Sequence, residues 1–376
     1  MVQRSRVLLA LAIALVGCRD PDPPPRVGAP AELVGTPFIE APRYARNVWD
    51  MQRFRGRIYL GHGDSGENRG PIALWSLDPA TGRLARGFET REEQVELFRV
   101  VDGELHVPGH DPRGRHPDGN FYRLEAGGWT LHRTIPHAVH AFDLASHGSR
   151  LFAAIGSGGS PGHPTLLASA NRGRTWTPVT DEVQRMYTLF ELRDTLYAAP
   201  KLESRGPPDG RELLRFDGAR FVSTGLGGAV LLPQLADTAG RIIRPLEFRG
   251  ALVYVVAGGT FDWRPASLAA AQRLDAPRTV ALPSAEAVPY DLLVRGDTLY
   301  VLAAAPSPSG GSLIYVYATG DLERWRELFR FNAPTFARSF EESGGDFFLG
   351  LGSTLRAPSP ATGAILRVRR ASYANP

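Results

Sequence analysis

The chain has one cysteine, Cys18, and one lysine, Lys201, among its 376 residues. A single cysteine excludes a disulfide within the chain and a zinc site built from several cysteines. All but one of the 43 basic residues are therefore arginines, and no run of them is longer than two. Nucleic-acid-binding proteins cluster their basic residues on one helix or stripe. This even spread argues against a nucleic-acid partner.

Long apolar runs are also missing. The longest, Val7–Val16, has ten residues, about half of the ~20 that a membrane-spanning helix needs. It follows Arg4 and Arg6, and this order fits the core of a secretory signal peptide. Helix interiors tolerate glycine and proline poorly, and the chain has 41 glycines and 31 prolines. With 43% apolar residues, the composition favours a folded protein of many short strands and turns.

The apolar run ends in Leu15-Val16-Gly17-Cys18, which resembles the lipobox of bacterial lipoproteins. The resemblance implies that residues 1–17 are a signal peptide and that Cys18 becomes the lipidated first residue of an exported, membrane-anchored protein. Residues 18–35 then form a stiff, proline-rich tether. Arg19 replaces the Asp that signals inner-membrane retention, which favours the outer membrane, facing the periplasm or the cell surface. An ordinary signal peptide with a leftover cysteine is the alternative.

A repeat runs through the rest of the chain. An apolar residue between a polar turn and small residues recurs at spacings of 47, 46, 45, 56, 47 and 48 residues. These seven anchors are Ile58, Leu105, Leu151, Leu196, Leu252, Leu299 and Phe347. Each copy contains four strand-like segments, as is typical of a β-propeller blade. We predict an all-β, seven-bladed β-propeller of four-stranded antiparallel blades over residues 36–376.

The seventh copy has only three strand-like segments, the last at Ala364–Arg369. We expect Thr36–Glu40 to pair with this segment as the fourth strand, because such pairing closes the ring and removes an open edge. The long fourth spacing predicts an insertion at Gly225–Gly240.

One octapeptide resembles the Asp-box (BNR) turn of sialidases and many other propellers. Its matching residues are Ser169, Asn171, Gly173 and Trp176, with Asn171 in place of the usual Asp. Asn makes the same kind of side-chain-to-backbone turn bonds. A degenerate copy lies at Thr319–Trp325. In that family the turn joins the third and fourth strands, remote from any active site, so the resemblance supports the fold and implies little about activity.

The sialidase resemblance also implies a substrate site of three arginines with a Tyr/Glu pair and an acidic Asp. Arg46, Arg185, Arg244 and Arg338 lie near the starts of first strands, with Tyr187 and Tyr290 close by. The family's Arg-Ile-Pro segment is scrambled here as Ile243-Arg244-Pro245, which weakens this interpretation.

The polar loops after the second strands hold most of the remaining candidates. Loops on a rigid scaffold commonly carry binding residues, and arginine pairs well with carboxylates, so we expect an anionic partner on this face. The candidate ligand-binding residues are Arg46, His62, Asp64, His110, Arg113, His116, His140, His163, Arg185, Arg244, Tyr290 and Arg338. The histidine spacing does not identify a metal site, and no motif indicates a cofactor or a catalytic residue.

Three aspartates, Asp50, Asp143 and Asp291, each follow an aromatic residue eight positions before an anchor. They could ring the central channel and hold water or a cation, or they could make hydrogen bonds at strand starts. The sequence as a whole predicts a monomeric, membrane-anchored binding or scaffold module for a protein or glycan. The alternative is a carbohydrate-active enzyme, a sialidase-like hydrolase or a lyase, acting at the channel mouth.

Overall fold

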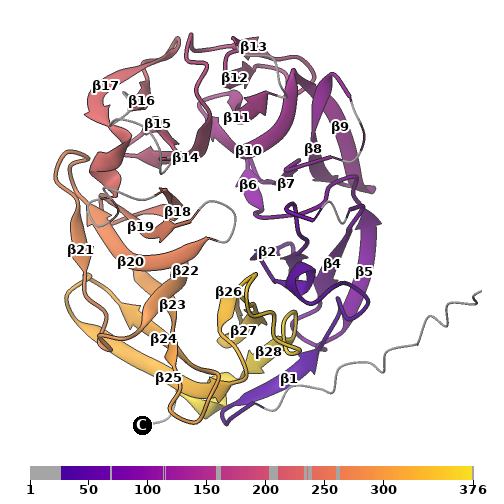
Figure 1. The fold of residues 1–376 in the computed structure, drawn as a ribbon, viewed down its shortest axis with the longest axis vertical. Coiled ribbons are helices and arrows are strands. Elements are labelled where there is room, and N and C mark those ends of the chain that lie inside the picture. The colour runs from indigo at the N-terminus through magenta and orange to yellow at the C-terminus, as the bar shows by residue number, and fades with distance from the viewer. Residues whose placement is uncertain are drawn as a thin grey trace, which may run out of the picture.

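The computed structural model describes residues 27–67, 70–112, 114, 116–157, 162–202, 211–232, 235, 239–259 and 263–374. The predicted signal peptide, Cys18 and the first part of the tether lie outside the described residues, as does Arg113. Seven four-stranded antiparallel sheets surround a central axis (Figure 1). The predicted seven-bladed β-propeller is therefore confirmed.

The first three blades follow one another along the chain. Blade 1 comprises β2 (Asp50–Phe54), β3 (Arg57–Gly61), β4 (Ala73–Leu77) and β5 (Leu84–Glu89). Blade 2 comprises β6 (Arg99–Val101), β7 (Glu104–Pro108), β8 (Asp118–Glu125) and β9 (Gly128–Pro136). Blade 3 comprises β10 (Ala138–His147), β11 (Arg150–Ser157), β12 (Leu166–Ser169) and β13 (Thr177–Pro178).

The remaining blades complete the ring. Blade 4 comprises β14 (Met186–Leu192), β15 (Thr195–Pro200), β16 (Glu212–Phe216) and β17 (Phe221–Gly227). Blade 5 comprises β18 (Gly240–Phe248), β19 (Ala251–Gly258), β20 (Arg264–Ala271) and β21 (Arg278–Val280). Blade 6 comprises β22 (Val288–Arg295), β23 (Thr298–Pro306), β24 (Ser312–Thr319) and β25 (Trp325–Ala333). Blade 7 comprises β26 (Ala337–Ser343), β27 (Asp346–Leu351), β28 (Ile365–Val368) and β1 (Ala31–Gly35).

The repeated anchor residues explain how the blades pack. All seven are at most 4% exposed, and they lie on second strands, where they contact neighbouring sheets. Leu196, for example, shares a cluster with Phe152 of the preceding blade. Tight hairpins join first and second strands. In blade 1, Arg55 and Gly56 both take left-handed angles, φ +45° and +76°, as a two-residue hairpin turn requires.

The N-terminal strand closes the ring in a different place from the one predicted. β1 is Ala31–Gly35, which pairs antiparallel with β28 (Figure 1), so the propeller begins at Ala31 and not at the predicted residue 36. Thr36–Glu40 instead forms a turn. Pro37 has no N–H to donate to a ladder, and Phe38 is buried against the ring of His62, with ring centroids 4.0 Å apart. Strand exchange at the closure is thus correct, but the strand was assigned five residues too late.

The predicted insertion, Gly225–Gly240, overlaps the end of β17 and the start of β18, and the rest of it joins these two strands. Its described part contains the short 3-10 helix η2 (Gly228–Leu231), and Leu231 and Leu232 pack into the apolar cluster between blades 4 and 5. Two other 3-10 turns, η1 (Tyr44–Arg46) and η3 (Arg370–Ser372), flank blades 1 and 7. Within the part of the chain that the structure describes, no helix has the length and apolar character needed to cross a membrane.

Both Asp-box-like turns have the expected geometry between third and fourth strands. The Ser169 hydroxyl oxygen accepts from the Gly173 N–H at 2.8 Å, and the Asn171 side-chain oxygen accepts from the Thr175 N–H at 2.9 Å. Trp176 packs edge-on against Phe121 of blade 2, with ring centroids 6.0 Å apart. In the degenerate copy, Asp321 accepts the N–H groups of Glu323 and Arg324. These turns stabilise the outer edges of blades 3 and 6.

Candidate functional site

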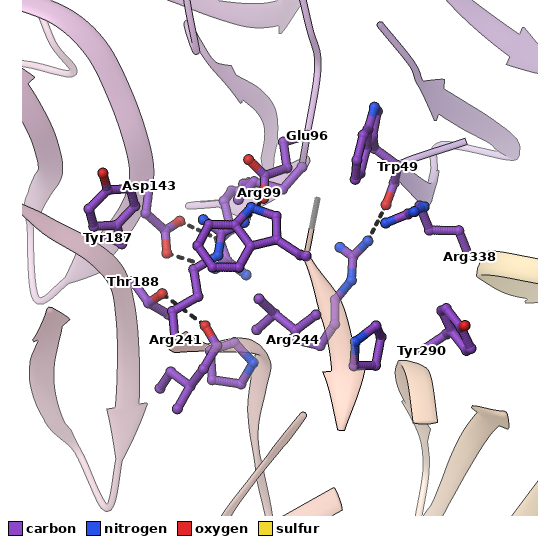
Figure 2. Close-up of a pocket in the computed structure, with 16 residues that line it drawn as sticks. Trp49, Glu96, Arg99, Asp143, Tyr187, Thr188, Arg241, Arg244, Tyr290 and Arg338 are labelled. Carbon is purple, nitrogen blue, oxygen red and sulfur yellow. Dashed lines mark hydrogen bonds and ion pairs between the residues drawn. The ribbon is translucent and has the colours of Figure 1, made fainter. Parts of the chain in front are cut away.

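A cavity of about 70 Å³ lies on the propeller axis. This volume exceeds the ~10–15 Å³ that one water needs. All seven blades contribute side chains to its wall, chiefly from their innermost strands, because the start of each such strand faces the axis (Figures 1 and 2). The polar and aromatic lining residues include Arg99, Arg241, Arg244, Arg338, Glu96, Asp143, Trp49, Trp263, Tyr187 and Tyr290.

Asp50, Asp143 and Asp291 fasten neighbouring blades around this cavity. In each, Oδ1 accepts the N–H of the following residue, at 2.8–3.0 Å. Oδ2 accepts an N–H from the next blade, donated by Phe98 at 2.6 Å, Leu189 at 2.8 Å and Phe340 at 3.1 Å respectively. The strand-start interpretation of these aspartates is therefore correct. They form interblade latches between blades 1 and 2, 3 and 4, and 6 and 7.

Two arginines neutralise the latch carboxylates. Arg99 makes a bidentate pair with Asp143, with Nε–Oδ1 and Nη2–Oδ2 distances of 2.7 and 2.8 Å. Arg244 of blade 5 joins two latches, since its Nη1 lies 2.7 Å from Asp50 Oδ1 and its Nε lies 3.1 Å from Asp291 Oδ1. Figure 2 shows the Arg244 side chain directed towards Trp49, whose carbonyl oxygen accepts a further bond.

The backbone of Arg244 is strained, and burial disfavours the charged form of Asp291. Arg244 adopts φ +54° within β18, where the register of the ladder shifts, and non-glycine residues rarely take this angle. Burial raises the pKa of Asp291 to about 7, and the nearby Asp50 charge adds to this, although Arg244 opposes it. Burial also raises the pKa of Asp50, again against the effect of Arg244. Within the Asp50–Arg244–Asp291 triad, the arginine is therefore the group that stabilises the charged form of both buried aspartates.

Arg241 forms a second cationic centre in the cavity. The side chain is buried, and its guanidinium carbon lies 3.9 Å from the centroid of the Trp263 ring. Nη2 pairs with Glu96, whereas Nε is buried with no hydrogen-bond partner among the described residues. Burial lowers the pKa of Arg241 to about 9, with a contribution from the Arg244 charge.

Glu96 also contacts His110, one of the predicted ligand-binding residues. Its Oε2 lies 3.5 Å from Nδ1 of His110. Burial and the neighbouring His140 lower the pKa of His110 to about 3, so His110 is neutral at physiological pH. Among the described residues, the charged partner of Glu96 is therefore Arg241.

Arg338 is held on the Trp49 side of the same cavity. Its guanidinium carbon lies 4.2 Å from the Trp49 ring centroid. Nε donates to the Asn47 side-chain oxygen at 2.9 Å, and Nη2 donates to the Ser353 carbonyl at 3.0 Å. Stacking on an indole and hydrogen bonds to two neutral oxygens hold the guanidinium in place.

An aromatic row, consisting of His140, Phe142, Tyr187 and Trp263, extends beside the cavity. The His140 and Phe142 ring centroids are 5.4 Å apart, and those of Phe142 and Tyr187 are 4.0 Å apart. The Lys201 ammonium lies between the last two rings, 5.5 Å from the Tyr187 centroid and 5.0 Å from that of Trp263. The row thus brings cations and aromatic faces together on blades 3 to 5.

The structure brings together six of the predicted ligand residues. Arg244, Tyr290 and Arg338 line the cavity, and His110 and His140 join it through Glu96 and the aromatic row. The exposed Arg185 lies over Gly156 beside Phe142.

The other predicted residues lie elsewhere. His62 and Arg46 are buried around the Phe38 turn, where His62 contacts the Ala73 carbonyl at 3.0 Å and burial lowers its pKa to about 4. Asp64 accepts the Gly66 N–H within a turn. His163 stacks on His137, with centroids 4.0 Å apart, and His116 is exposed, accepting the Asp118 N–H. No group of three or more metal-ligating side chains occurs among the described residues.

The sequence analysis did not predict three charged residues that line the cavity. These are Arg99, Arg241 and Glu96. One signal could have found Arg241: two charged residues interrupt an apolar first strand in Arg241-Ile-Ile-Arg244, and a charge in an inner strand is costly unless it is paired or binds something.

Comparisons with known proteins establish the fold alone. No family model matches the sequence, and no curated protein matches it either. Among solved structures, a chain from one described as "Crystal Structure of Mitotic Checkpoint Complex" has a TM-score of 0.52 and 11% identity, covering 96% of this chain and 99% of that one. A prolyl endopeptidase structure has a TM-score of 0.42 and 13% identity, covering 80% of this chain and 46% of that one.

Proposed function

We propose that the protein is an exported lipoprotein, anchored through an acylated Cys18, whose propeller binds an anionic protein or glycan partner at the channel mouth. The observation that carries the binding proposal is the axial cavity, whose wall sets Arg241 against the Trp263 ring and Arg338 against the Trp49 ring. Concave sites with a few convergent polar groups on aromatic walls are the usual form of ligand sites. The anchor rests on the segment Leu15–Cys18.

The charges and rings at the mouth support an anionic partner. Lys201 and Arg241 share the Trp263 ring, and Arg338 stacks on Trp49. Cations fixed in this way lose little side-chain freedom when they bind an anion. The exposed Arg185 adds a further positive charge at the rim.

A carbohydrate-active enzyme receives less support from the same geometry. A sialidase-like site needs arginines that are open to the substrate carboxylate, but Arg99 and Arg244 are already paired with Asp143, Asp50 and Asp291. We therefore propose binding and not hydrolysis.

The binding proposal predicts that wild-type protein, probed on an array of acidic and neutral oligosaccharides and acidic peptides, selects acidic ligands. Arg185→Glu should weaken this binding by about tenfold, corresponding to ~1.4 kcal/mol, because it reverses a charge at the rim. Arg326→Glu, an exposed position in β25 of blade 6, is the matched control and should bind as wild type does. Equal binding by both variants, or no preference for acidic ligands, would refute the proposal.

The anchor is tested separately in cells fed a clickable fatty acid. We expect the wild-type protein to incorporate the label and Cys18→Ser to lose it, because the only thiol in the chain is removed. The variant should still fold, since the first strand of the propeller, Ala31–Gly35, begins 13 residues after the substituted position. Label retained on Cys18→Ser would exclude lipidation at this residue.

A further inference from the structure

A groove with a volume of about 690 Å³ lies between blades 4 and 5, away from the axis. Its wall comes from the first hairpin and outer strands of blade 4 and from Gln272–Asp275, the turn between β20 and β21 of blade 5. Leu192, the last residue of β14, lines the groove, whereas the axial cavity lies at the starts of the first strands. The groove is therefore separate from the proposed partner site.

The same strand positions line a second, smaller groove of about 150 Å³ between blades 2 and 3. The pairing of the strands identifies the positions that correspond. In blade 4 and blade 2 respectively they are Leu192 and Val101, Arg193 and Asp102, Thr195 and Glu104, Tyr197 and His106, and Arg215 and Arg123. The groove between blades 2 and 3 thus serves as an internal reference for the other.

Glu104 supplies a carboxylate to the groove between blades 2 and 3. It pairs with Arg172 of blade 3, and its Oε2 lies 3.6 Å from Nε of Arg123. Asp102 lines the same groove, and its charge also acts on Arg172. Both arginines of this groove are therefore paired within the chain.

The groove between blades 4 and 5 lacks both of these carboxylates. Thr195 takes the place of Glu104, and Arg193 takes the place of Asp102. A neutral side chain thus replaces one acid, and a cation replaces the other. Three wall residues are arginines, whereas only Asp275 is acidic.

The three arginines of the wall differ in what they contact. Arg273 pairs with the one acidic wall residue at 2.5 Å. Arg193 donates from Nε and Nη2 to the neutral carbonyl oxygen of Gly250, at 3.2 and 3.1 Å. The exposed Arg215 side chain makes no hydrogen bond or ion pair among the described residues. Its charge acts on Asp217, whose Oδ1 accepts two backbone N–H groups.

Two further carboxylates close to the groove accept hydrogen bonds from neutral donors. Glu247 accepts the backbone N–H of Arg193 at 2.8 Å, and Glu212 accepts the Ser223 hydroxyl. Neither carboxylate lines the groove. The wall itself therefore has more positive than negative charge.

The rest of the wall is partly apolar. Tyr197 and Leu226 are half-buried and pack against the apolar cluster between blades 4 and 5, which includes Leu274. Concave sites of roughly 300–1,000 Å³ that combine apolar walls with a few charged groups suit small organic ligands. The size of the groove and its mixed wall therefore fit a small acid with an apolar body.

We propose that this groove binds a small organic acid. The carboxylate of the ligand takes the place that the Glu104 carboxylate has between blades 2 and 3, and Arg215 is its principal donor, because arginine and carboxylate form charge-assisted hydrogen bonds. The apolar body of the ligand lies against Tyr197, Leu226 and Leu274. This site is additional to the axial cavity and does not depend on the proposed function.

Calorimetric titration of the full-length chain, purified in detergent, with sodium benzoate at constant ionic strength tests the inference. Benzoate should bind saturably, and benzamide, which has the same ring and a neutral amide, should not. Arg215→Gln should weaken benzoate binding by about tenfold or more, as expected for loss of a charge-assisted bond. Arg330→Gln, at an exposed position on blade 6, is the control and should leave the affinity unchanged.

Thr195 offers a matched pair of variants. Thr195→Glu should weaken benzoate binding by about tenfold or more, because it restores within the chain the carboxylate that Glu104 supplies in blade 2. Thr195→Gln has nearly the same length without the charge and should bind as wild type does. If Thr195→Glu does not fold, Arg215→Gln and the benzamide titration decide.

Four results would overturn the inference. These are no saturable benzoate binding, equal binding of benzamide, an affinity unchanged in Arg215→Gln, and equal losses in Thr195→Glu and Thr195→Gln. Arg185→Glu, at the channel mouth, should leave benzoate binding unchanged. The groove and the axial site are therefore tested separately, and failure of either leaves the other standing.

Discussion

Replacing Arg244 by alanine should destabilise the protein by about 3–5 kcal/mol at pH 7, the usual cost of leaving buried charges unpaired. Arg244 is the cation that neutralises both Asp50 and Asp291. This loss is a large part of the ~5–15 kcal/mol by which domains are stable. Urea unfolding of wild type and variant measures it. Arg330→Ala, which removes an exposed pair with Glu327, should cost under ~0.5 kcal/mol.

The effect of Arg244→Ala should depend on pH in a defined direction. The folded-state pKa of Asp291, about 7, lies above its ordinary value of 3.8, so the native state binds a proton more readily than the unfolded state. The stability associated with that proton is lost as the pH rises from about 4 to 7. Without Arg244 both aspartates should hold protons still more strongly. The destabilisation should therefore be smaller at pH 5 than at pH 7, and equal losses at both pH values would contradict the triad.

Deleting Ala31–Gly35 should cost about 4 kcal/mol or more. Four residue pairs join β1 to β28, each backbone hydrogen bond contributes about 1 kcal/mol, and the deletion exposes the edge of β28. Thermal unfolding measures the effect, and the deletion should also promote aggregation through the open edge.

A shorter deletion is the control for closure by β1. Removing Arg19–Arg26 leaves intact the Gly28 N–H, which donates to the Asn332 carbonyl at 2.8 Å, and should leave the melting temperature unchanged. Equal melting temperatures for the two deletions would show that β1 does not close the ring.

The fold could be predicted because its signals are local and repeated. Each blade carries its own anchor and hairpin turn, and all seven anchors are buried in the folded protein. The closing strand was misplaced because Phe38 and Ile39 give Thr36–Glu40 an apolar pattern like that of a strand, whereas Phe38 packs against His62 in a turn. Its burial is a tertiary contact that no local pattern encodes.

The site was harder to predict, for a physical reason. The sequence prediction favoured histidines in polar loops. The cavity is lined mainly by charged side chains at the starts of inner strands, and these pair with side chains of other blades. Arg244 pairs with Asp50, which is 194 positions away in the chain, and no spacing rule links them. Arg241 stands out only once its burial and its unpartnered Nε are known.

A crystal structure of the protein soaked with sodium glucuronate tests most directly whether the axial cavity is the ligand site. Density for the sugar acid should appear at the axial cavity, beside the arginines and aromatic rings that line it. A cavity that holds only water while glucuronate is absent, or is bound on another face, would contradict it.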